Sequence, residues 1–75
     1  MMNSIQETIE ERALEHLNEH GDAETIVLDT YTYALFIEEL GIRIYKPLDK
    51  VYVETFDKYL NIEVDENAEE LVSFI

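Results

Sequence analysis

With 75 residues and no cysteine, this chain has to fold around one small hydrophobic core. A chain of this length buries only roughly 60% of the surface that its unfolded form exposes, so its stability has a thin margin. No disulfide can support the fold, and no thiolate is available for a zinc site or for covalent catalysis. The hydrophobic content of 47% is too high for a disordered acidic tail. The sequence therefore predicts a single folded domain over residues 1–75.

The charge of the chain is gathered at its two ends. Five Lys and Arg stand against 18 Asp and Glu, which gives a formal net charge of −13. Residues 1–24 hold seven acids and one Arg, and residues 63–75 hold five acids and no base. The middle of the chain, 25–62, is nearly balanced, with six acids and four bases. This distribution disfavours direct binding to nucleic acid or to anionic membranes, because both require clustered cations.

The chain also lacks the sequence features of an exported or membrane-inserted protein. No apolar run approaches the roughly 20 residues that cross a bilayer. The N-terminal residues Met1-Met2-Asn3-Ser4 have no basic stretch before an apolar one. We therefore expect a cytoplasmic protein.

Helical signals are clearest at the N-terminus. Ser4 and Glu7 have the spacing of a capping box, and an apolar residue follows every four positions from Ile5 to Leu17. This pattern predicts a helix over 4–20, with Gly21 after its end.

A second apolar pattern from Ile26 to Leu40 predicts another helix, which Asp22 would cap. The alternative is a strand over Thr25–Leu28, because this segment is β-branched and apolar, and then the helix starts at Asp29.

The remaining segments are more ambiguous. Pro47 can open a helix with one apolar face, made of Leu48, Val51, Tyr52, Phe56, Tyr59 and Leu60. The alternative is a hairpin in which 42–45 pairs with 50–54. A last helix is predicted after Asp65, with Ala68, Leu71, Val72 and Ile75 facing inward. The preferred fold is a compact, mainly α bundle of three to four helices, and the alternative is an α+β domain with a hairpin at 42–54.

An acidic column on the first helix is the main candidate for a binding surface. It consists of Glu7, Glu11, Glu15 and Glu19. Four-residue spacing places successive carboxylates about 6 Å apart along one face. Each like-charged pair at this spacing destabilises a helix by about 0.2–0.5 kcal/mol, so the column favours a cationic partner. The alternative is a solvated face that only keeps the protein in solution.

Other residues complete the predicted interface. Glu66, Glu69 and Glu70 form a second acidic patch if the C-terminal segment folds onto the same side. Two tyrosines, Tyr31 and Tyr45, fit the helical faces least well and are predicted to be exposed contact residues, because tyrosine combines apolar area with a polar tip.

Metal, cofactor and catalytic sites find little support. His16 and His20 could share a metal at i,i+4 spacing, but Leu17 stands where zincins have Glu, so these histidines are expected to act as cations at the helix C-terminus. Ser4 and Ser73 lie at the chain ends, and no glycine-rich loop is present. We expect no metal, no cofactor and no enzymatic activity.

The sequence therefore predicts a non-enzymatic acidic regulator or inhibitor that binds a basic protein surface, such as the nucleic-acid-binding site of another protein, by mimicking nucleic acid. In size, residue usage and acidity it resembles small regulatory and inhibitor proteins of bacteriophages and bacteria. One alternative is a small homodimeric assembly protein whose acidity serves solubility, since Leu71–Ile75 is apolar. A further alternative is a DNA-binding regulator, because 37–42 resembles the turn of a helix-turn-helix.

Overall fold

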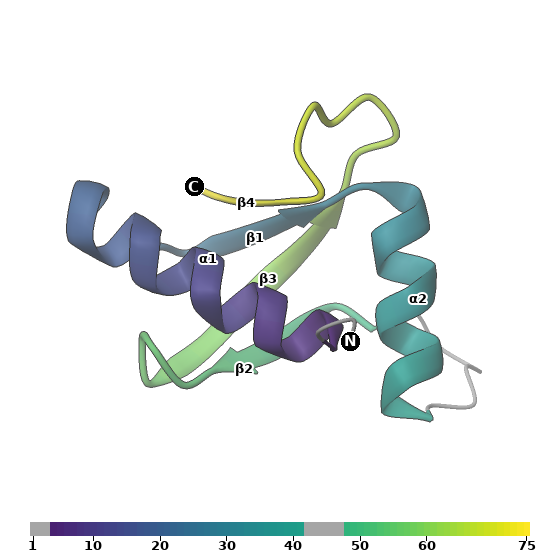
Figure 1. Ribbon diagram of the computed structural model, residues 1–75, viewed down its shortest axis with the longest axis horizontal. Coiled ribbons are helices and arrows are strands. Elements are labelled where there is room, and N and C mark those ends of the chain that lie inside the picture. Colours follow the sequence, from purple (N-terminus) through teal and green to yellow (C-terminus); the bar gives the residue numbers. More distant parts are fainter. Residues whose placement is uncertain (1–3, 42–47) are drawn as a thin grey trace.

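The computed structural model describes residues 4–41 and 48–75. Two helices pack against one face of a four-stranded mixed sheet (Figure 1). In chain order the elements are α1 (Ile5–His20), β1 (Thr25–Leu28), α2 (Thr30–Leu40), β2 (Lys50–Val53), β3 (Lys58–Val64) and β4 (Val72–Phe74). The described part of the chain is therefore an α+β fold.

The order of the strands in the sheet is β2-β3-β1-β4. β2 and β3 form an antiparallel hairpin, while β1 pairs in parallel with β3 and antiparallel with β4. Ile26 of β1 thus lies between Ile62 of β3 and Phe74 of β4. The strand nearest the N-terminus is internal, and both of its neighbours come from the C-terminal half of the chain.

The core lies between the helices and the sheet. Ile9 and Ala13 of α1 and Phe36 of α2 are buried against alternate residues of the strands, which are Ile26, Leu28, Val53, Leu60, Val72 and Phe74. Alternation follows from the pleat, because successive side chains of a strand point to opposite faces. The hydroxyl of Tyr33 donates to the carbonyl of Leu48 and accepts from its N–H, both at 3.0 Å, and so joins α2 to the segment before β2.

The prediction for α1 is confirmed. Ser4 caps the helix by accepting a hydrogen bond from the N–H of Glu7 at 3.0 Å, and Gly21 ends it with a φ of 82° that favours glycine. Ile9 and Ala13 are buried as predicted, but Leu17 is 39% exposed.

The prediction of a helical bundle is wrong, and the α+β alternative fits. Residues 25–28 form a strand, and α2 begins after Asp29, whose carboxylate accepts from the N–H of Thr32 at 2.7 Å. Asp22 therefore caps no helix. Thr25–Leu28 is short and β-branched, and it lies in the middle of a sheet, where its apolar side chains are buried on pairing.

The helices predicted after Pro47 and after Asp65 do not form within the described residues. The first segment becomes β2 and β3, joined by a turn at 54–57, and the second ends in β4. Val51 and Leu60 fit a helix face by spacing, but they equally occupy one face of a hairpin. Val53, which does not fit the helix face, lies on the same face of the hairpin, and all three reach the core. A hairpin was also predicted, but its strand at 50–53 pairs with 58–64, while 42–47 lies outside the described residues.

An ion pair joins the α1–β1 connection to β3. Lys58 Nζ donates to Asp22 Oδ2 at 2.9 Å and lies 3.6 Å from Glu24 Oε1. The hydrogen bond from Lys58, followed by the N–H of Ala23, lowers the pKa of Asp22, and the hydrogen bond to Asp22 raises the pKa of Lys58.

The two shifts define a pH window for this ion pair. A carboxyl group whose pKa is lowered on folding stabilises the fold at pH values above its unfolded pKa. This stabilisation is lost as the pH falls through the folded pKa. An amine whose pKa is raised on folding stabilises the fold at pH values below its unfolded pKa. This stabilisation is lost as the pH rises through the folded pKa. We therefore expect Asp22→Asn to lower the urea midpoint between about pH 5 and pH 9. This difference should shrink as the pH falls below the ordinary aspartate pKa of about 3.9 and Asp22 becomes protonated. A midpoint difference that persists at low pH would contradict this assignment.

Candidate functional site

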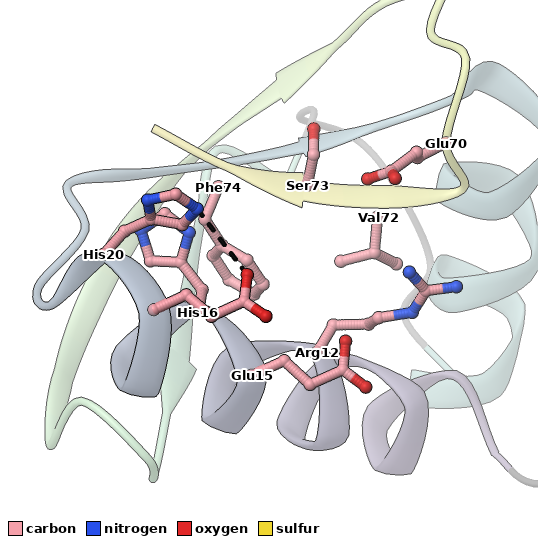
Figure 2. A pocket seen from close by; sticks show the side chains of 9 residues that line it. Arg12, Glu15, His16, His20, Glu70, Val72, Ser73 and Phe74 are labelled. Carbon is pink, nitrogen blue, oxygen red and sulfur yellow. Dashed lines mark ion pairs between the residues drawn. The ribbon is translucent and has the colours of Figure 1, made fainter.

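The acidic ends of the chain meet at a groove between α1 and β4 (Figure 2). We name it the β4 groove, and its volume is about 500 Å³. The α1 side is formed by Arg12, Glu15, His16, Glu19 and His20, and the other side by Glu70 and β4. Because a four-residue step falls 40° beyond a full helical turn, the acidic column rotates along α1, and its last two members reach this groove.

The floor of the β4 groove is aromatic. The ring of His16 lies 5.5 Å from the ring of Phe74 and 5.1 Å from that of His20, measured between centroids. Phe56 lies 5.6 Å from Phe74 in an edge-to-face arrangement. His20 also pairs with Glu19 at 3.7 Å, an exposed contact that contributes little to stability. The groove therefore combines mutually tilted aromatic rings with carboxylates at its rim.

The first half of the column lines a second groove, of about 410 Å³, at the N-terminal half of α1. We name it the N-terminal groove, and it is lined by Ser4, Gln6, Glu7, Glu10, Glu11 and Glu54. The four aligned carboxylates are thus divided between two shallow surfaces.

Glu10 has a structural role that the sequence did not suggest. Its Oε2 accepts from the N–H of Glu54 at 3.0 Å, and its Oε1 accepts from the N–H and the hydroxyl of Thr55 at 3.0 and 2.9 Å. One carboxylate therefore binds the backbone of the β2–β3 turn and attaches it to α1. Bonds to an ionised acceptor are among the stronger hydrogen bonds in proteins.

Glu39 has a comparable role at the start of α1. Its two carboxylate oxygens accept from the N–H groups of Ile5 and Gln6 at 2.7 and 3.0 Å. These donors belong to the first turn of the helix, where no intrahelical acceptor exists and where a negative charge is favoured. A side chain at the end of α2 thus completes the cap that Ser4 begins.

Of the other predicted contact residues, those within the described part of the chain lie away from both grooves. Glu66 and Glu69 are exposed in the segment between β3 and β4. Tyr31 is 70% exposed on α2, as predicted. Tyr45 lies outside the described residues. The structure thus brings Glu70 alone of the C-terminal patch to the acidic column.

The metal, membrane and helix-turn-helix interpretations can be compared with residues 4–41 and 48–75, which the structure describes. Within these ranges no group of three or more His, Cys, Asp and Glu side chains is arranged to hold a metal ion. No described helix combines the length and apolar character needed to cross a bilayer. The helix-turn-helix interpretation needs a second helix after Gly41, but residues 48–60 supply strands and a turn instead.

Comparisons of this chain with protein-family models, with curated proteins and with solved structures find no significant match.

Proposed function

We propose that this protein is a non-enzymatic acidic regulator that binds a basic protein surface through the β4 groove. The observation that supports the proposal is the convergence of Glu15 and Glu19 from α1 with Glu70 from the C-terminal segment. Such a rim attracts Lys and Arg side chains, and the half-buried ring of His16 offers a surface on which a guanidinium can stack. The partner that fits best is a nucleic-acid-binding protein, because its binding site already presents clustered cations.

The expected action is competition. A protein with a net charge of −13 is drawn to a basic surface by long-range attraction, which raises the association rate and is screened by salt. Once bound, it would occupy the site that nucleic acid needs. The proposal places this action in the cytoplasm, where a chain without cysteine needs no oxidising environment.

Two charge-reversed variants test the proposal. E15K/E19K/E70K alters the β4 groove, and E38K/E66K/E69K alters exposed acids elsewhere, so both carry a net charge of −7. With immobilised protein in about 50 mM salt, we expect wild type and the second variant to capture basic proteins from a lysate. The groove variant should retain roughly tenfold less, and about 300 mM salt should release the captured proteins.

The captured protein is then tested for displacement of its nucleic acid by the wild-type chain. Equal capture by the two variants would show that only net charge matters and would contradict a site in the β4 groove. Capture without displacement would contradict the competitive action.

A further inference from the structure

The face of the sheet opposite the helices is left uncovered by the described elements. Strand residues that point away from the core form this surface, which we name the open sheet face. On β2 and β3 they are Lys50, Tyr52, Tyr59, Asn61 and Glu63, and on β1 and β4 they are Thr25, Val27 and Ser73. Their partners in the register are neighbours on this face, so Tyr52 lies beside Tyr59 and Val27 lies beside both Glu63 and Ser73.

This face has the composition of an interface. Tyr52 and Tyr59 pack edge to face with centroids 5.3 Å apart, and Tyr59 is 69% exposed. Leu71, which precedes β4 and follows the same alternation, is 53% exposed. Val27 is buried without belonging to the core cluster, because its neighbours on the open face surround it. Tyrosine and aliphatic residues around a buried centre are typical of protein–protein contacts.

The charge of the open sheet face identifies its occupant. Its described strand residues carry one cation, Lys50, and one anion, Glu63, so the face is neutral in a chain whose net charge is −13. A basic partner has no electrostatic reason to bind here. A second copy of the chain fits better. Two copies repel each other wherever their acidic surfaces meet, but the neutral open sheet faces can meet without this repulsion. A two-fold axis in the plane of the interface, passing between the two residues, places Lys50 of each copy opposite Glu63 of the other.

We propose that two copies of this chain associate through their open sheet faces. The strands have four, four, seven and three residues, and at a rise of about 3.3 Å and a strand spacing of about 4.8 Å they give a surface of roughly 300 Å² on each copy. This is below the roughly 800 Å² per partner of a stable complex, so the dimer is weak and forms at high micromolar concentration. Packing the two faces together covers the tyrosines, and Ser73 is the one open-face residue that also lines the β4 groove among the described residues.

Salt separates this inference from the proposed function. Screening weakens the binding of a basic partner, but it strengthens the dimer because it reduces repulsion between two chains of −13. Sedimentation equilibrium from about 10 µM to about 1 mM protein, at about 0.05 and 0.5 M salt, should therefore show more dimer at the higher salt. A wild-type chain that stays monomeric at about 1 mM in high salt would overturn the inference and leave the proposed function unaffected.

Two leucines with the same exposure locate the contact. Leu71 and Leu14 are both 53% exposed, but Leu14 lies on α1, away from the open sheet face. L71D should weaken the dimer at least tenfold, whereas L14D, with the same change of charge and apolar area, should leave it unchanged. Equal weakening by both variants, or none by L71D, would overturn the assignment of the face.

A charge exchange then identifies the partner as a second copy. K50E and E63K each place like charges opposite one another across the two-fold axis, so each should weaken the dimer. The double variant K50E/E63K restores the pairing and should restore association to near the wild-type level. Failure of the double variant to recover, with circular dichroism showing a folded chain, would overturn the proposed arrangement.

Discussion

The variant Glu10→Gln is expected to unfold about 5–20 °C below the wild type. The carboxylate of Glu10 accepts three hydrogen bonds from the β2–β3 turn, two from backbone N–H groups and one from the hydroxyl of Thr55. An amide has one acceptor oxygen, and its NH₂ group would face N–H donors. Bonds to a charged acceptor contribute about 1.5–3 kcal/mol each, and donors left without a partner add about 1–3 kcal/mol. Because these bonds are exposed or only partly buried and the amide oxygen can keep one of them, we expect a total loss of about 1–3 kcal/mol. One kcal/mol moves the melting temperature of a domain of this size by about 4–8 °C.

Glu15→Gln is the matched control, since it makes the same chemical change on the same helix. Glu15 is exposed, no hydrogen bond or ion pair of its side chain is found among the described residues, and its removal relieves repulsion from Glu19. Its melting temperature should equal or slightly exceed that of the wild type. If thermal denaturation followed by circular dichroism shows the same shift for both variants, Glu10 does not hold the turn as described.

The second large effect is expected at Phe36. This side chain is 1% exposed and is the largest fully buried group among the described residues, and it joins α2 to the core cluster. Replacing a buried Phe by Ala costs about 3–5 kcal/mol through lost burial and the remaining cavity. A 75-residue domain has a total stability of roughly 4–11 kcal/mol. Phe36→Ala should therefore lose between about a quarter and all of the stability of the fold, as measured by urea titration and by near-ultraviolet circular dichroism.

Tyr31→Ala provides the comparison on the same helix. Tyr31 is 70% exposed, so truncating it removes an aromatic ring without opening a cavity. The change in unfolding free energy should stay within about 0.5 kcal/mol. A large loss at Tyr31, or a small one at Phe36, would mean that α2 presents a different face to the core.

The local signals in the sequence were sufficient for α1 and for the end of α2, whereas the preferred prediction began the second helix too early, at Asp22. Ser4 begins α1, Asp29 begins α2, and Gly21 and Gly41 end them, and all four residues act within one turn of their own positions. The β-strands depend on partners far along the chain. Leu60 fits a helix face by spacing, and only its position opposite Val51 in the hairpin shows that it belongs to a sheet.

The same distinction applies to the candidate site. The spacing of Glu15 and Glu19 could be read from the sequence, but their approach to Glu70 depends on β4 pairing with β1. Glu10 and Glu39 look like other exposed acids in the sequence, because their acceptor roles involve backbone groups 33 to 45 residues away. Charge patterning therefore identified the acidic surface, whereas it could not distinguish carboxylates that bind solvent from those that hold the fold.

The position of β1 inside the sheet has a consequence for the order of folding. Its two neighbours are β3, which starts at Lys58, and β4, which ends at Phe74. During synthesis, a chain that has emerged only as far as α2 offers β1 no partner, and its apolar residues stay unpaired until nearly the whole sequence is available. Such non-local pairing slows folding relative to a helical bundle of the same length. Loss of β4 alone would open one side of β1 as a free edge, the kind of surface on which chains aggregate.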